Sequence, residues 1–159
     1  MTVRQRVSTC LWFDDNGEEA ADFYVSLFPN SRIISVSRYG EGGMMRKGVA
    51  MLTRFELDGV PYAALNGGTH FKLSEAASIV ALCDTQAEID RLWSALLADG
   101  GEESRCGWLK DRFGLSWQVI PSVLNDIMAG DQARLDRVMA AIMPMTKIEL
   151  AAIEKAARE

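Results

Sequence analysis

The sequence has few of the residues that metal centres and disulfide frameworks require. It contains one histidine, His70, and three cysteines, Cys10, Cys83 and Cys106. An odd number of widely spaced cysteines is typical of neither a disulfide framework nor a zinc knuckle. A single histidine so placed cannot complete a Ser/His/Asp or Cys/His catalytic arrangement. We therefore expect free thiols, a bacterial-type reducing cytoplasm and no metal.

Long apolar runs and runs of one charge are also absent. No stretch approaches the ~18 apolar residues that a membrane span needs, and the N-terminal residues lack the apolar core of a signal peptide. The 17 Lys and Arg residues form no run and are outnumbered by 22 Asp and Glu. The sequence therefore predicts neither a nucleic-acid nor a membrane partner. A chain of 159 residues, 48 % of them hydrophobic, suits one domain or two small halves that share a core.

A pattern of strand, helix and further strands occurs twice. In the first copy, Asn16 and the acids after it predict a helix start, Pro29 ends that helix, and Asp58-Gly59 predicts a hairpin. In the second copy, Thr85 and Glu88 form a capping box. The order predicts an internally duplicated α+β domain and not a doubly wound parallel sheet. The expected strands cover residues 7–13, 32–39, 49–57, 60–65, 78–83, 105–110 and 115–120.

The tail differs in character from the two copies. Helical spacing predicts three helices over residues 122–129, 131–143 and 146–157, the last opened by a second capping box, Thr146-x-x-Glu149. We therefore expect a duplicated domain over residues 1–121 and a helical extension over 122–159. The extension is expected to pack on the same domain or on a dimer partner.

Several motifs carry a resemblance to a known family. They are Cys10-Leu-Trp-Phe-Asp14, Glu18-Glu-Ala-Ala-Asp-Phe-Tyr24, Leu27-Phe-Pro-Asn-Ser31, Leu65-Asn-Gly-Gly68, Cys106-Gly-Trp-Leu-Lys-Asp111, Gly114-Leu-Ser-Trp-Gln118 and the tail Arg137-Val-Met139 to Lys147-Ile148. The chain resembles the PhnB-like, or 3-demethylubiquinone-9 3-methyltransferase-like, family of the vicinal-oxygen-chelate superfamily, which includes glyoxalase I, bleomycin-resistance proteins and extradiol dioxygenases.

The resemblance implies two βαβββ modules, over about residues 7–68 and 77–121, that curl around a shared cavity and often dimerise. In metal-dependent members His or Glu ligands lie on the first and last strands of each half. Carried onto this chain, those positions fall on Thr9, Ser78 and Gln118, with Ala63 or Ala64 as the fourth. Two hydroxyls, an amide and a methyl do not supply the anionic or imidazole ligands of a divalent ion. We therefore expect a metal-free cavity without a cofactor.

Strand alternation predicts which side chains face that cavity. Thr9, Ser78 and Gln118 are expected to point inward together with Leu11, Phe13, Val80, Leu82, Ser116 and Ile120. The expected outward set, against the helices, is Cys10, Trp12, Cys83, Trp117 and Val119. Gln118 offers donors and a neutral acceptor, so it either orients a ligand or satisfies backbone groups at a bulge. Asn66 lies at the pocket mouth or in a turn, and Trp108 stacks on a ligand or packs at the rim. The predicted ligand-binding residues are Gln118, Ser116, Thr9, Ser78, Phe13, Asn66 and Trp108.

Three functions are compatible with such a cavity. The first is capture of a small, largely uncharged molecule without a metal. The second is an enzyme (a lyase, an isomerase, or a methyltransferase as the family label suggests) that polarises its substrate through neutral groups, with catalytic residues unidentified. The Gly40–Gly43 loop lies between two predicted strands, which argues against an adenosylmethionine cradle. The third is a structural or regulatory homodimer whose cavity is vestigial.

Overall fold

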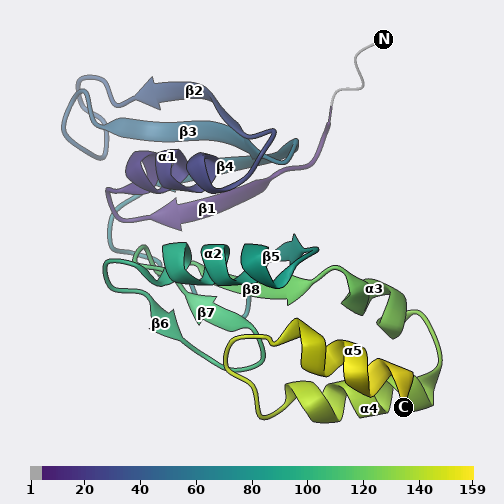
Figure 1. Ribbon diagram of the computed structural model, residues 1–159. Helices are drawn as coiled ribbons and strands as arrows, with labels where there is room; N and C mark the ends of the chain where they lie inside the picture. The colour runs from purple at the N-terminus through teal and green to yellow at the C-terminus, as the bar shows by residue number, and fades with distance from the viewer. Residues whose placement is uncertain (1–4) are drawn as a thin grey trace. The chain divides into compact units, whose positions relative to one another are not determined.

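The computed structural model describes residues 5–159, which form two compact units that divide between Leu73 and Ser74. The first unit contains β1 (Thr9–Phe13), α1 (Gly17–Leu27), β2 (Arg32–Arg38), β3 (Ala50–Leu57) and β4 (Val60–Asn66) (Figure 1). Its strands form one sheet in the order β1-β4-β3-β2, in which β1 is parallel to β4 and the other pairs are antiparallel.

The second unit repeats this arrangement and continues into three helices. It contains β5 (Ser78–Cys83), α2 (Gln86–Leu97), β6 (Glu102–Glu103), β7 (Trp108–Lys110) and β8 (Ser116–Pro121). The sheet order is β5-β8-β7-β6, again with a parallel first pair. The predicted α+β class with two βαβββ modules is confirmed. The helices that follow are α3 (Val123–Met128), α4 (Gln132–Ile142) and α5 (Leu150–Arg158).

Two short-range signals act as the sequence predicts. The Thr85 hydroxyl accepts a hydrogen bond from the Glu88 amide over 3.2 Å, and the Glu88 carboxylate accepts one from the Thr85 amide over 3.3 Å, which completes the capping box. Asp58 and Gly59 have φ of 46° and 77°, the left-handed conformation that a two-residue hairpin turn requires.

The other two predicted helix starts have different outcomes. Asn16 is the N-cap residue directly before α1, as predicted, but its side chain makes no capping hydrogen bond. Thr146 does not open a helix, because α5 begins only at Leu150. The Thr146 carbonyl instead accepts a hydrogen bond from Gly107 over 2.8 Å, so residue 146 belongs to a connection that contacts the sheet.

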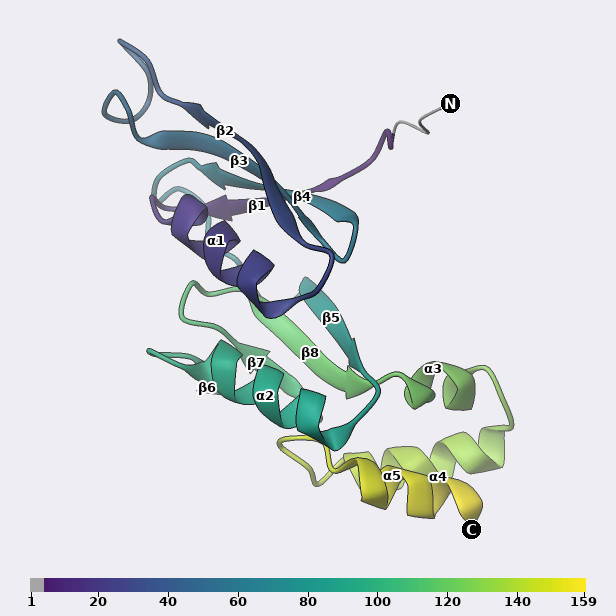
Figure 2. The ribbon, with the colours of Figure 1, turned by 45° about the horizontal axis from the view of Figure 1, so that its top comes forward.

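Each unit's helix covers one face of its own sheet (Figure 2). In the first unit, Leu11 and Phe13 lie on the covered face, and a Cβ added to Gly17 of α1 would meet the Phe13 ring at 3.2 Å. Because side chains alternate along a strand, Thr9 shares this face while Cys10 and Trp12 lie on the other one. The predicted inward and outward sets for residues 9–13 are therefore wrong.

The error comes from the length of one connection. Three residues separate β1 from α1, whereas two residues separate β5 from α2. The two strands therefore enter their helices one residue out of step, and a shift of one residue exchanges the two faces of a strand.

In the second unit the side chains lie on the predicted faces of the sheet. Trp117 and Val119 of β8 and Cys83 of β5 are buried on the face that α2 covers. On the opposite face Val80 and Leu82 are 46 % and 49 % exposed. We call this the open face of the second sheet.

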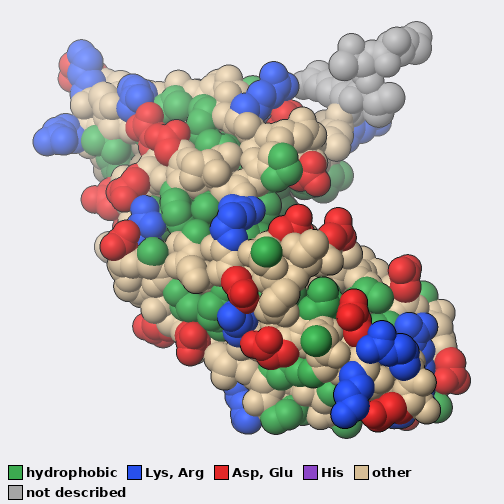
Figure 3. Space-filling view, in the orientation of Figure 1, with side chains coloured by type: hydrophobic (Ala, Val, Ile, Leu, Met, Phe, Trp, Pro, Cys, Tyr) green, Lys and Arg blue, Asp and Glu red, His purple; other side chains and the backbone are tan. Residues whose placement is uncertain are grey.

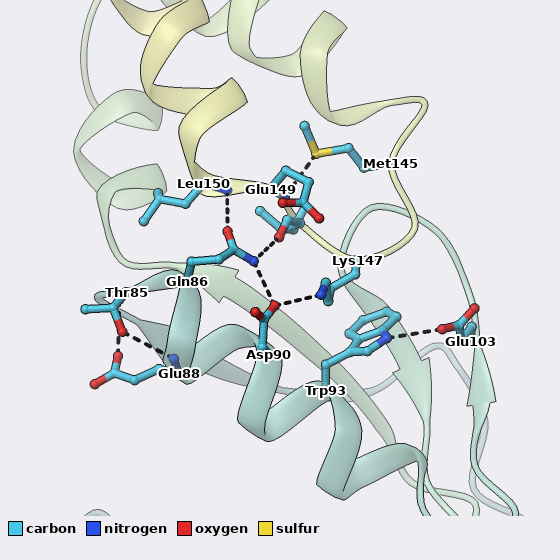
Figure 4. A network of polar contacts seen from close by, with 11 residues as sticks. Thr85, Gln86, Glu88, Asp90, Trp93, Glu103, Met145, Lys147, Glu149 and Leu150 are labelled. Carbon is cyan, nitrogen blue, oxygen red and sulfur yellow. Dashed lines mark hydrogen bonds and ion pairs between the residues drawn. The ribbon is translucent and has the colours of Figure 1, made fainter.

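The C-terminal extension is attached to the second unit by the connection between α4 and α5. The backbone amides of Cys106 and Gly107 donate to the carbonyls of Met145 and Thr146, each over 2.8 Å. The Gln86 side chain of α2 then bridges two backbone groups, donating to the Ile148 carbonyl over 3.0 Å and accepting from the Leu150 amide over 2.8 Å (Figure 4). Residues 145–150 therefore contact the segment before β7 and then α2 of the same chain.

No helix within residues 5–159 is both long enough and apolar enough to cross a bilayer. On the face drawn in Figure 3, acidic and basic side chains are interspersed over the extension, without a large area of one sign.

Candidate functional site

The open face of the second sheet has a neutral polar pair at its centre. Gln118 of β8 donates from Nε2 to the Ser78 hydroxyl of β5 over 2.9 Å. In the strand register, Gln118 lies between Val80 on one side and Trp108 of β7 on the other. Among the described residues nothing donates to the Gln118 Oε1 atom, so this neutral acceptor remains available beside exposed apolar side chains.

A pocket of about 190 Å³ is lined by Ser116 and Trp108, the strand neighbours of Ser78 and Gln118. Ser116, two residues before Gln118 and on the same face, is fully buried and lines it. Its Oγ has no hydrogen-bond partner among residues 5–159. Buried polar groups are nearly always hydrogen-bonded, so this hydroxyl is a candidate contact for a bound molecule. The pocket lining is Glu75, Glu102, Glu103, Ser104, Trp108, Leu109, Lys110 and Ser116.

One ion pair lies at the pocket wall. Lys110 Nζ is 2.6 Å from the Glu75 carboxylate. Hydrogen bonding to Glu75 raises the pKa of Lys110, and the charge of Glu102 adds to this effect. The same contact with Lys110 lowers the pKa of Glu75. Both groups therefore stay ionised at neutral pH, and Lys110 is a poor general base.

The predicted ligand-binding residues of the first half occupy other positions. Phe13 is buried beneath α1. Asn66 is buried as well: its Oδ1 accepts from Gly17 over 2.7 Å, and its Nδ2 donates to the carbonyls of Asp15 and Ala50, each over 3.0 Å. Its polar atoms are thus used within the first unit, and Asn66 is the last residue of β4 and not part of a turn with positive φ. Thr9 is exposed at the start of β1, on the face that carries Leu11 and Phe13.

The structure therefore brings together four of the seven predicted residues, on one face of the second sheet: Gln118, Ser116, Ser78 and Trp108. Lys110, Glu75 and Glu102 line the same pocket and were not among the predicted residues. Lys110 could have been predicted from the sequence, because it follows Trp108 by two positions and strand alternation places both residues on one face. Glu75 and Glu102 carry no such signal, since one lies in a loop and the other in a two-residue strand.

Comparison with known proteins agrees with this architecture. The profile of the family described as 3-demethylubiquinone-9 3-methyltransferase matches residues 5–120. The chain belongs to this family. A PhnB protein from Bacillus cereus, named as a candidate member of the same methyltransferase group, is 33 % identical, covers 74 % of this chain and 98 % of its own, and has a TM-score of 0.67. The family lies within the vicinal-oxygen-chelate superfamily.

More distant structures share the fold alone. A protein from Pseudomonas aeruginosa is 22 % identical over 74 % of this chain and 98 % of its own, with a TM-score of 0.62. The fosfomycin resistance protein FosX from Mesorhizobium loti is 15 % identical over 81 % of this chain and 100 % of its own, with a TM-score of 0.56. No curated protein sequence matches the chain. The family match ends before α3, so the helical extension lies outside it.

Proposed function

We propose that this protein binds a small, largely uncharged molecule on the open face of its second sheet, without a metal ion. The observation that carries the proposal is the buried Ser116 hydroxyl, which has no hydrogen-bond partner within residues 5–159 and lines a pocket one strand position from the neutral Gln118–Ser78 pair. The exposed side chains of Val80 and Leu82 supply apolar contact area on the same face. A few placed polar groups on an apolar surface are typical of small-molecule sites.

The donors on this face do not fit a divalent metal. Ser78 and Gln118, at positions where the superfamily resemblance places metal ligands, offer a neutral hydroxyl and a neutral amide. The amide nitrogen of Gln118 is already used as a donor to Ser78. Protein sites for divalent ions are built from carboxylate, imidazole or thiolate ligands. Within residues 5–159 no three His, Cys, Asp or Glu side chains are grouped so that they could hold an ion.

An enzyme of the same superfamily is the second candidate, and the methyltransferase description of the family favours it. Neutral donors such as Gln118 and Ser116 can polarise a carbonyl. A proton transfer, however, needs a group whose pKa lies near the working pH. Lys110 has a raised pKa and is paired with Glu75, so it does not meet this condition. The geometry therefore favours binding over catalysis.

A thermal-shift screen tests the proposal. We expect neutral aromatic amides and alcohols to raise the Tm of the wild-type protein, and Gln118→Leu and Ser116→Ala to lose that response. Gln132→Leu is a matched control, because Gln132 is exposed on α4. Zinc, nickel and manganese salts are expected to leave the Tm unchanged. A saturable Tm increase with one of these ions, lost in Gln118→Leu, would overturn the metal-free proposal.

We further propose a cytoplasmic location and a homodimer. The free thiols of Cys10, Cys83 and Cys106 suit a reducing compartment. The dimer remains a prediction, which light scattering of the purified protein tests: a mass of one chain at micromolar concentration would contradict it.

A further inference from the structure

We infer that the ligand carries an amine, whose positive charge enters the pocket lined by Trp108, Ser116 and the surrounding carboxylates. This inference rests on the proposed function and names the chemical class of one end of the ligand. The largely uncharged remainder would lie along the open face, over Val80, Leu82 and the Gln118–Ser78 pair.

The charges at the pocket favour a cation. Its lining contains three carboxylates, Glu75, Glu102 and Glu103, and one ammonium, Lys110. Lys110 is held by Glu75 at 2.6 Å and also feels the charge of Glu102. An anionic ligand would therefore have to displace a carboxylate and approach a second one, which opposes its binding.

The carboxylates differ in how far they are already engaged. Glu75 is paired with Lys110, and Glu103 accepts a hydrogen bond from the Trp93 indole over 3.2 Å (Figure 4). Within the described part of the chain, the Glu102 carboxylate forms neither a hydrogen bond nor an ion pair. An ammonium group in the pocket would pair directly with the exposed Glu102 carboxylate, whose recorded interaction is the longer-range one with the charge of Lys110.

Two neutral groups at the pocket also suit an ammonium. The Ser116 Oγ has no partner among residues 5–159 and has lone pairs that can accept from an N–H donor. Trp108 is half-buried and lines the same pocket, and indole is the aromatic ring that attracts cations best. Ser116 and Trp108 are therefore additional contacts that do not depend on the carboxylates.

The size of the pocket limits what enters it. Its volume of about 190 Å³ is below the roughly 300–1,000 Å³ of sites that hold a whole drug-sized ligand. The pocket therefore takes one end of the molecule, and the rest stays on the open face. This division reconciles a charged end with a largely uncharged ligand.

Three benzyl compounds of similar size test the inference: benzylamine, benzyl alcohol and benzoate. The readout is the indole N–H signal of Trp108 in ¹H–¹⁵N spectra, assigned with Trp108→Phe. We expect benzylamine to shift this signal with a Kd at least ten-fold lower than that of benzyl alcohol, and benzoate to have no effect. Raising the salt concentration should weaken benzylamine alone.

A matched pair of variants locates the charge. Glu102→Gln is expected to weaken benzylamine several-fold and to leave benzyl alcohol unchanged. Glu41→Gln is the control, because Glu41 is an exposed carboxylate of the first unit, paired with Lys47. Equal affinities for benzylamine and benzyl alcohol would overturn the inference that the ligand carries an amine, but they would support the proposed binding of a neutral molecule. If none of the three compounds shifts the Trp108 signal, the proposed function fails as well.

Discussion

The backbone amide of Gly17 donates a hydrogen bond of 2.7 Å to the side-chain oxygen of Asn66, 49 positions later in the sequence. This bond joins the first residue of α1 to the last residue of β4. It satisfies one of the helix's free N–H groups, the task that an N-cap side chain usually performs. The start of α1 is thus capped from the sheet and not by its own N-cap residue, Asn16.

Gly17→Ala is predicted to destabilise the protein. A Cβ at this position would lie 2.7 Å from Asn66 Oδ1 and 3.2 Å from both Ala64 and Phe13. The clash should outweigh the gain in helix propensity and cost about 1–3 kcal/mol. Urea unfolding measures this change. Gly40→Ala is the control, since nothing lies within 4 Å of its added Cβ; a Gly17→Ala protein as stable as Gly40→Ala would contradict the close packing.

Asn66→Asp is predicted to destabilise the first unit by about 2–4 kcal/mol at neutral pH, because it removes two buried donors and adds a buried charge. The donors now bond to the carbonyls of Asp15 and Ala50. Burial should raise the pKa of the new carboxyl, so the loss should diminish as the pH falls and the group becomes protonated. Urea unfolding at pH 5 and pH 8 tests whether the destabilisation by Asn66→Asp is smaller at the lower pH. Asn125→Asp, at an exposed position of α3, should show little of either effect.

Asp111→Asn is predicted to weaken the turn that leads into β8. Asp111 is buried and accepts hydrogen bonds from the amides of Phe113 and Leu115 through Oδ1, and from the Trp117 indole through Oδ2 over 2.8 Å. An amide nitrogen cannot accept a hydrogen bond, so one donor is left unpaired at a cost of about 1–3 kcal/mol. Thermal unfolding checks the value. Asp22→Asn, at an exposed site on α1, should leave the Tm within error; a comparable loss there would show that net charge is responsible.

Cys83 is predicted to be unreactive in the folded protein. Its thiol is buried, and burial together with the nearby Glu88 charge raises its pKa to about 11. Because the thiolate is the reactive form, a disulfide reagent at pH 8 should modify exposed Cys10 and spare Cys83 until denaturant is added. Cys83→Ala should remove the denaturant-dependent fraction only. Rapid labelling of Cys83 in the native protein would show that the face beneath α2 opens readily.

Docking of the 145–150 connection is predicted to weaken in acid. Lys147 Nζ lies 2.7 Å from Asp90 (Figure 4), and hydrogen bonds from Lys147 and then Gln86 lower the pKa of Asp90. A carboxyl group whose pKa is lowered by folding contributes stability to the folded state. This contribution is present above the pKa of about 3.9 that the group has in the unfolded chain, and it is lost as the pH falls below that pKa. Proteolysis of residues 143–150 by an acid-active protease should therefore accelerate below about pH 4. The Asp90→Asn protein should be cleaved faster than the wild type at pH 6, and its cleavage rate should rise less on further acidification. A cleavage rate equal to that of the wild type would show that the Lys147–Asp90 ion pair does not hold the connection.

The features that the sequence predicted correctly depend on neighbours along the chain. The capping box of Thr85 and Glu88 is closed within four residues, and the Asp58-Gly59 turn needs only the conformational freedom of two residues. The resemblance placed Gln118 toward the cavity, and strand alternation then placed Ser116 on the same face of β8. Such local preferences act before any tertiary contact forms.

The features that could not be predicted from the sequence depend on partners far along the chain. Nothing near Gly17 indicates that Asn66 caps α1, and nothing near Thr146 indicates that its carbonyl pairs with Gly107 and delays α5. The face of Phe13 depended on one extra residue before α1, which periodicity does not register.

By itself, then, the sequence determined the duplicated α+β class and the order of its strands and helices apart from the short strand β6. Only the tertiary structure decided that Asn66 and Phe13 support α1, and that Lys110, Glu75 and Glu102 join Ser116 at one pocket. The reason is physical: a strand's periodicity specifies two faces, but the packing of a helix against one of them selects which face is covered.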